Sequence, residues 1–240
     1  VCQIIECSEN IGGAGGFARG LSQALLFDTD CILFIDDDAI LSDDYMEKLL
    51  LARTQYPEYH AFAGSVIANG KIDTCHRRML SGTGFFLKDC KESFYSKGFF
   101  TCDIVSFCGM VVDKETAEEI GPPHENYFIW HDDVEYSLRI RRYSRFLIVS
   151  NAVLNHKTRS GTTGKHPRRY EWRDYYAIRN RIWMVREHGS LFDQIVNFTD
   201  LFIRVIFRNW LFGLLKVDHY DWNYEKRMVR KAIHDSHHVI

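Results

Sequence analysis

The chain has 240 residues, of which 46% are hydrophobic and 26% charged, an ordinary globular composition that excludes a disordered chain. Its length is enough for one sizeable core, with room for an appended subdomain. The formal net charge of −2 argues against a general nucleic-acid-binding protein, and no apolar run reaches the ~18 residues that a membrane-spanning helix needs.

The first part of the chain predicts a βαβ pattern. Residues 2–7 predict a strand, "ENIGGAGGFARG" a glycine-rich loop leading into a helix that ends near Phe27, and residues 31–35 a second, buried strand. Ser42 is the expected N-cap of the next helix, which should end before Pro57.

The rest of the chain continues the alternation, which predicts an α/β fold. The expected strands cover residues 61–68, 83–88 and 146–154, and residues 103–121 should form a strand that turns into a short helix. Helices are expected over residues 170–188 and 201–217.

The glycine-rich segment has two interpretations. Its four glycines, Gly12, Gly13, Gly15 and Gly16, remove side chains just before a helix, which lets backbone N–H groups approach a phosphate. The alternative is a tight strand-to-helix turn. The segment lacks the Lys-Ser/Thr ending of a P-loop and the spacing of the dinucleotide fingerprint.

In "CILFIDDDAILSDD", a buried strand runs into three consecutive aspartates, which repel one another unless a cation is present. Side chains alternate along a strand, so Asp36 and Asp38 share one face and Asp37 points to the other. Two carboxylates on one face favour a divalent metal that also binds diphosphate oxygens. The alternative is a solvated acidic loop that caps the next helix.

A second acidic group lies in "FIWHDDVEYSLRI", residues 128–140, where Asp132, Asp133 and Glu135 adjoin aromatic residues. A carboxylate that is partly desolvated by aromatic neighbours has a raised pKa, as a general base requires. The alternative is a helix N-terminus whose acids offset the helix dipole, and both interpretations are compatible.

Two features concern the surroundings of such a site. The chain is basic between Arg139 and Arg186, and an acidic metal site beside a basic surface suits a phosphorylated ligand. Seven cysteines at scattered spacings, without a C-x-x-C pair, argue against a zinc site or a disulfide framework and favour the reducing cytosol.

Together these segments resemble an inverting glycosyltransferase of family 2 with the GT-A fold. "NIGGAGGFARG", "FIDDDAIL" and "GPPHENYFIWHDDVEYSLRI" follow one another in the order, and at similar distances to, the family's glycine loop, D-x-D motif and acidic acceptor motif. The most similar subgroup is the bacterial galactofuranosyltransferases, followed by the rhamnosyltransferases. The likeness extends from residue 1 to about residue 190.

The resemblance implies an α/β fold with a mixed sheet flanked by helices, a catalytic domain over residues 1–190 and a helical extension over residues 191–240. It also implies roles for particular residues. Asp133 would be the base, with Asp132 and Glu135 near the acceptor sugar. Asp36, Asp38 and His156 would hold Mn²⁺ or Mg²⁺. The donor-binding residues would be Asn10, Gly12, Gly13, Gly15, Gly16, Arg19 and Asp37.

The implied reaction moves a sugar from a nucleotide-diphospho-sugar to a hydroxyl of a glycan or lipid-linked acceptor, with inversion. UDP-galactofuranose is the favoured donor and dTDP-rhamnose the next. Family members normally open with a strand and helix that hold the nucleotide base, and no matching segment precedes Val1, so we expect an N-terminally incomplete chain. The rival interpretations are a nucleotidyltransferase and a non-catalytic carbohydrate-binding or scaffold fragment.

The C-terminal region has its own pattern. In "LFIRVIFRNWLFGLLKV", Arg204, Arg208 and Lys216 fall on one side of a helix that is otherwise apolar, as in helices that lie at an anionic membrane surface. A peripheral position at the inner face of the plasma membrane is therefore one expectation. The alternative is docking against the core or a second subunit.

Overall fold

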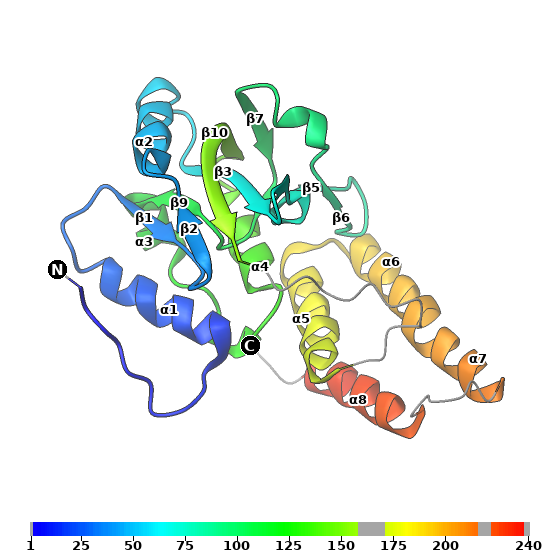
Figure 1. Ribbon diagram of the computed structural model, residues 1–240. Coiled ribbons are helices and arrows are strands. Elements are labelled where there is room, and N and C mark those ends of the chain that lie inside the picture. Colours follow the sequence, from blue (N-terminus) through cyan, green and yellow to red (C-terminus); the bar gives the residue numbers. More distant parts are fainter. Residues whose placement is uncertain (1, 158–170, 216–221, 238–240) are drawn as a thin grey trace. The chain divides into compact units, whose positions relative to one another are not determined.

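The computed structural model describes residues 2–157, 171–215 and 222–237 of the chain (Figure 1). Two compact units are present. The first contains the described strands and α1 to α4, and the second contains α5 to α8 with residues 81–86 and 127–131. Several basic residues lie outside the described residues. In the basic stretch between Arg139 and Arg186 these are Arg159, Lys165, Arg168 and Arg169, and in the C-terminal region they are Lys216 and the side chains of Arg204 and Arg208.

The elements follow the chain in alternation. The strands are β1 (Cys31–Phe34), β2 (Ala39–Leu41), β3 (Ala61–Ala68), β4 (Lys71–Ile72), β5 (Arg77–Leu80), β6 (Leu87–Asp89), β7 (Phe99–Cys102), β8 (Ile104–Val105), β9 (Met110–Asp113) and β10 (Phe146–His156). The α-helices are α1 (Gly12–Ala24), α2 (Tyr45–Gln55), α3 (Lys114–Ile120), α4 (Asp132–Ile140), α5 (Trp172–His188), α6 (Leu191–Leu201), α7 (Arg208–Leu214) and α8 (Trp222–Asp235).

In the described part of the chain, seven strands form one mixed sheet in the order β1-β9-β3-β10-β2, with β4 paired to β3 and β7 to β10. β10 runs parallel to β3 and antiparallel to β7 and β2. Its first residues pair with β7 and its last three with β2, and its register against β3 shifts between Val149 and Val153. β6, β5 and β8 form a small antiparallel sheet. The long β10 therefore reaches β2 with its final residue, His156.

Helices cover both faces of the main sheet, as the alternation of strand side chains requires. On one face, alternate strand residues pack against α1, α3 and α4, and on the other face the intervening residues pack against α2. The first cluster includes Phe34, Ala63, Met110 and Ile148, and the second includes Leu49, Phe62, Val111 and Leu147. The mixed α/β class expected from the sequence is confirmed.

The hydroxyl of Tyr45, at the start of α2, lies buried between two strands. The Gly64 N–H donates to this hydroxyl at 2.9 Å, and the hydroxyl donates to the Gly109 carbonyl at 2.7 Å. Both glycines are required, because a Cβ on Gly64 would lie 2.5 Å from the Tyr45 ring and Gly109 has a φ of 81°. One hydroxyl therefore satisfies two buried backbone groups.

The guanidinium of Arg77, at the start of β5, is completely buried. It donates to the carbonyls of Gly64, His76 and Cys108 at 2.9, 2.9 and 3.0 Å. A buried cation is tolerated when its donors are hydrogen-bonded. The same bonds hold β3, the start of β5 and the turn before β9 at fixed positions.

Several boundaries differ from the sequence prediction. Residues 2–7 form no strand, because they are exposed and their backbone pairs with no neighbour. α1 begins at Gly12, so the glycines lie in its first turns and not in a loop before it. The small buried residues Ala14 and Ala18 allow this helix to pack closely.

Three later predictions also need correction. α2 begins at Tyr45, because the Ser42 hydroxyl donates to Asp44 instead of capping the helix. The strand expected over residues 83–88 shrinks to β6, since Gly84 and Phe85 have left-handed φ angles of 73° and 51°. The helix expected over residues 201–217 is a π-helical turn, Phe202–Phe207, followed by α7.

Within the second unit, Asn180 of α5 holds the loop that precedes α4. This asparagine is fully buried, and its amide donates to the carbonyls of Tyr127, Ile129 and Trp130 at 2.8, 3.0 and 2.8 Å. Phe128, Trp130 and His131 have φ angles of 62°, 66° and 67°. Such backbone is strained in non-glycine residues and persists because surrounding contacts over-determine it.

Within this second unit, α5 packs against both α6 and α8. The domain boundary expected after residue 190 stays a prediction. No helix of the described residues has both the length and the apolar character to cross a membrane. All seven cysteines are free thiols.

Tyr45→Phe removes the hydroxyl that serves Gly64 and Gly109. We expect the free energy of unfolding to fall by about 1–3 kcal/mol, because two buried backbone groups lose a partner. Urea unfolding followed by circular dichroism measures this loss. Tyr59→Phe is the matched control, since its ring packs on the same core cluster. An equal loss in both variants would contradict the role of the hydroxyl.

Candidate active site

The pairing of β2 with β10 brings the first acidic segment to His156. Ala39 of β2 lies opposite His156 in the ladder. As a result, the His156 Nε2 lies 2.9 Å from Asp38 Oδ1 and 4.0 Å from Asp36 Oδ2. The ligand atoms of these three residues all lie within 4.8 Å of one another. Asp37 is exposed.

A second imidazole and a thiol adjoin this cluster. The rings of His76 and His156 meet edge to face with centroids 5.1 Å apart, and the Asp36 carboxylate adds to the burial that raises the pKa of the Cys108 thiol. Burial, helped by the Arg77 guanidinium, lowers the pKa of His76 to about 4, so its imidazole is neutral at neutral pH. Burial raises the pKa of Cys108 to about 12.

The second acidic pair stands at the first turn of α4. Burial and the adjacent Asp133 raise the pKa of Asp132 to about 7. Burial also raises the pKa of Asp133, and Arg78, whose Nη2 lies 3.7 Å from Asp133 Oδ2, opposes that rise. Asp133 in turn raises the pKa of Asp36. The two acidic segments therefore interact electrostatically and belong to one region of the first unit.

Glu135 occupies a different environment. Its carboxylate is fully buried and accepts a hydrogen bond from Arg139 Nη2 at 2.9 Å. Arg139 also donates to the Ile120 carbonyl at 2.6 Å, which ties α4 to the end of α3. These contacts favour a structural task, and the acceptor role expected of Glu135 stays a prediction.

The glycine segment forms the start of α1. The Asn10 side chain accepts the first backbone N–H of the helix at 3.0 Å, and the Arg19 guanidinium lies 3.7 Å from the Cys7 sulfur. A Cβ on Gly13 or Gly16 would meet nothing within 4 Å beyond the helix itself, so a ligand can approach the backbone there. These hydrogen bonds do not reach the acidic residues, and the donor-binding role of the segment stays a prediction.

His76, Arg78 and Cys108 were not singled out by the sequence. The available signal was "HRR" at residues 76–78, three basic residues directly before an apolar pair. Cys108 lies in a turn before β9 and carries no spacing pattern. Their proximity to the aspartates results from strand pairing, which a local pattern does not reveal.

The donor atoms at Asp36, Asp38 and His156 suit a divalent ion. Two carboxylates and one imidazole are ligands that Mn²⁺ and Mg²⁺ accept. The pKa of Asp36 is raised chiefly by burial, and Asp38 and Asp133 add to the rise. A bound cation would relieve that repulsion. The residues present therefore fit the metal that the sequence resemblance implied.

The architecture matches solved structures of glycosyltransferases. The chain is similar to "Crystal structure of GalNAc-T7 with UDP, GalNAc and Mn2+", with a TM-score of 0.54 and 13% identity over 76% of this chain and 36% of that chain. It is also similar to S. aureus TarS 1-349, with a TM-score of 0.53 and 12% identity over 96% of this chain and 61% of that chain. At such identities the likeness shows the fold, which is the GT-A fold.

The sequence comparisons define the family. The model of Glycosyl transferase family 2 matches residues 1–121, half of the chain, and the chain belongs to this family. Two relatives are named galactofuranosyltransferase GlfT2, from Mycolicibacterium smegmatis (26% identity over 77% of this chain) and Mycobacterium tuberculosis (23% over 77%). The chain spans about a third of their length, 31% and 32%. The family inferred from the motifs is confirmed.

The raised pKa of Asp132 predicts a pH-dependent stability. Between about pH 4 and its folded pKa of about 7, the folded protein binds this proton more tightly than the unfolded chain, so stability falls as pH rises. Asp132→Asn removes this loss and should raise the melting temperature increasingly from pH 4 to pH 8, by ~2–4 °C per kcal/mol relieved. Thermal melts in the presence of a chelator measure it. A difference that is constant with pH would contradict the assignment.

Proposed function

We propose that the chain is the catalytic part of a glycosyltransferase that moves a sugar from a nucleotide-diphospho-sugar to a hydroxyl of a glycan or lipid-linked acceptor. The observation that carries the proposal is the gathering of two acidic segments in one region of the GT-A fold. Asp36 and Asp38 lie beside His156, a set suited to a metal-bound diphosphate. Asp132 and Asp133 form a separate pair suited to proton transfer.

The donor would be held from two directions. In this proposal Asp36, Asp38 and His156 hold Mn²⁺ or Mg²⁺, which when bound neutralises charge on the departing diphosphate. The open backbone at the start of α1 accepts phosphate oxygens. The remaining donor contacts are assigned to Asn10, Gly12, Gly13, Gly15, Gly16, Arg19 and Asp37.

Asp133 is the proposed general base. It takes the proton from the acceptor hydroxyl as that oxygen attacks the anomeric carbon on the face opposite the diphosphate, so the configuration inverts. Arg78 beside it favours the ionised carboxylate, the form that a base requires. Asp132, with a pKa of about 7, is assigned to the acceptor sugar.

The names of the relatives guide the choice of donor. Both curated relatives are named galactofuranosyltransferases, which favours UDP-galactofuranose, with dTDP-rhamnose the next candidate. Transfer assays with each donor test this choice. A nucleotidyltransferase would instead consume a sugar-1-phosphate. A non-catalytic module would bind the metal and donor without turnover.

Asn substitutions separate the two acidic segments. Asp38→Asn should weaken the binding of Mn²⁺ and of the donor together, and His156→Ala should do the same. Asp133→Asn should leave both affinities nearly unchanged and lower the transfer rate by ~10²–10⁴-fold, because the amide keeps the shape of the carboxylate and loses its basicity. Asp132→Asn should act chiefly on the apparent affinity of the acceptor.

Titration calorimetry with Mn²⁺ and the donor, alongside initial rates, measures these effects. Asp43→Asn is the matched control, since this exposed aspartate belongs to the same acidic stretch and lies outside the cluster. Near wild-type transfer by Asp133→Asn would remove it as the base, and unchanged metal affinity in His156→Ala would remove that residue from the metal site.

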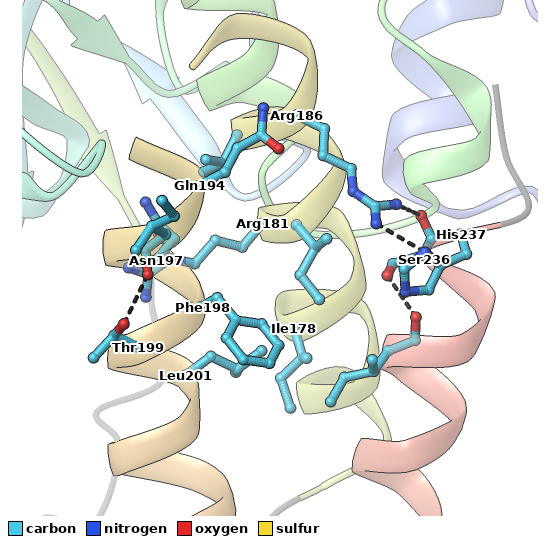
Figure 2. A pocket seen from close by; sticks show the side chains of 14 residues that line it. Ile178, Arg181, Arg186, Gln194, Asn197, Phe198, Thr199, Leu201, Ser236 and His237 are labelled. Atoms are coloured by element: carbon cyan, nitrogen blue, oxygen red, sulfur yellow. Dashed lines mark hydrogen bonds between the residues drawn. The ribbon is translucent and has the colours of Figure 1, made fainter. Parts of the chain in front are cut away.

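The second unit supports the peripheral membrane contact expected from the sequence. Leu191, Ile195, Phe198 and Phe202 follow helical spacing and are between 47% and 78% exposed, and Trp210 of α7 is 53% exposed. Ile195 and Phe198 also line a groove of about 350 Å³ formed by α5, α6 and α8 (Figure 2). α8 adds exposed cations at residues 226, 227, 230 and 231. Exposed aromatic and aliphatic side chains, together with exposed cations of the same unit, suit an anionic lipid surface.

Phe198→Asp should reduce binding to vesicles that contain anionic lipid, because the substitution places a charge in the apolar row. Co-sedimentation with vesicles of phosphatidylglycerol and phosphatidylcholine measures it. Leu51→Asp is the control, since Leu51 of α2 is 62% exposed in the first unit. Equal binding by the two variants would exclude the row as the membrane contact.

A further inference from the structure

A thiol and two imidazoles converge beside the aspartates. One donor atom from each of His76, Cys108 and His156 lies within 4.8 Å of the other two. Cys108 is fully buried, whereas the side chains of His76 and His156 are each 12% exposed, so the histidines lie on the solvent side of the cluster. The Nδ1 atom of His156 is buried without a hydrogen-bond partner.

The chemistry of this set differs from that of the carboxylate set. Thiolate and imidazole are ligands for Zn²⁺ and other borderline or soft ions, whereas Mg²⁺ and Mn²⁺ prefer oxygen. In a tetrahedral zinc site with Zn–N of ~2.0–2.1 Å and Zn–S of ~2.3 Å, donor atoms lie roughly 3.3–3.6 Å apart. The donors here lie within 4.8 Å of one another, so metal binding would draw them closer together.

We propose that His76, Cys108 and His156 form a second metal site, selective for Zn²⁺ and similar soft ions, which competes with the aspartates for His156. The cysteine spacing argued against a zinc site because no two cysteines are suitably placed in the sequence. The fold meets the requirement differently, with one cysteine from the turn before β9, one histidine from directly before β5 and one from the end of β10.

The shared histidine makes the two sites mutually exclusive. A neutral imidazole has one nitrogen lone pair for a metal ion. His156 can therefore be a ligand of an ion held by Asp36 and Asp38, or of an ion held by His76 and Cys108, but not of both. Zn²⁺ in the second site therefore removes a ligand from the first. If the proposed transferase function holds, Zn²⁺ inhibits transfer by displacing the histidine from the Mn²⁺ site, and this consequence alone rests on the proposed function.

A neighbouring group of donors is the competing explanation for any bound soft ion. Asp73, Cys75 and His76 also have donor atoms within 4.8 Å of one another. Cys75 is exposed and Asp73 already accepts the Cys75 N–H at 3.2 Å. The two groups share His76 and differ in their cysteine, so the identity of the cysteine decides between them.

Co²⁺ is the probe, because a cobalt ion bound by thiolate gives a charge-transfer absorption in the near ultraviolet that oxygen and nitrogen ligands do not give. Titrating the metal-free chain with Co²⁺ and then with Zn²⁺ should produce this absorption and then abolish it. Cys108→Ser and His76→Gln should both lose it, with Zn²⁺ affinity lower by at least the ~10–100-fold that loss of a supporting residue brings. Cys75→Ser and the exposed control Cys7→Ser should retain it.

The outcomes separate clearly. Absence of the absorption in the wild-type chain, or its survival in Cys108→Ser, would overturn the site, and its loss in Cys75→Ser would assign the ion to the neighbouring group. His156→Ala keeps the test valid if Cys108→Ser does not fold, because His156 belongs to the proposed site and not to the neighbouring group. Asp38→Asn should keep the absorption. In this variant Mn²⁺ should no longer compete with Zn²⁺ for binding, and this measurement needs no transferase activity. A chain that binds Co²⁺ as expected but transfers no sugar would contradict the proposed function alone.

Discussion

The buried guanidinium of Arg77 is the constraint on which the candidate site depends. A cation enclosed by a protein core must find acceptors for its donors, and this one finds three backbone carbonyls from separate segments. Two of those carbonyls belong to His76 and Cys108, whose side chains adjoin the aspartates. Tyr45 completes the arrangement on the other side of Gly64. The location of the candidate site is thus set by the Arg77 guanidinium, which is itself buried.

Strand pairing then decides which donors meet. The segment between β1 and β2 supplies carboxylates, and the end of β10 supplies an imidazole. The segments held by Arg77, just before β5 and β9, supply a second imidazole and a thiol. Carboxylate oxygens and the softer thiol and imidazole donors therefore share one small region. Which ion binds depends on all of these donors together. The acid pair at α4 lies close enough to influence Asp36, so metal occupancy and proton transfer are electrostatically linked.

Local patterns in the sequence predicted what is locally determined. β3 matches the strand predicted over residues 61–68, because its apolar run is a local pattern. The start of α4 was predicted from the acidic residues in its first turn. The strand-alternation argument for Asp36 and Asp38 does not hold, since β1 ends at Phe34 and Asp37 and Asp38 lie in the turn before β2. His76 and Cys108 could not be predicted from a local pattern, since pairing between distant strands places them. The strand expected at residues 2–7 failed for the same reason, because strands require partners. The roles of the site residues rest on family resemblance.

The hydrogen bonds from Asn180 to the loop before α4 limit where the chain can be shortened. A piece that ends before α5 would retain both acidic segments and lose the amide that holds three carbonyls of residues 127–131. Left-handed backbone at Phe128, Trp130 and His131 would then relax, with a driving force of ~1–3 kcal/mol for each residue. A minimal fragment that keeps this loop in place must therefore include α5. A fragment chosen to contain the acidic residues alone would be too short.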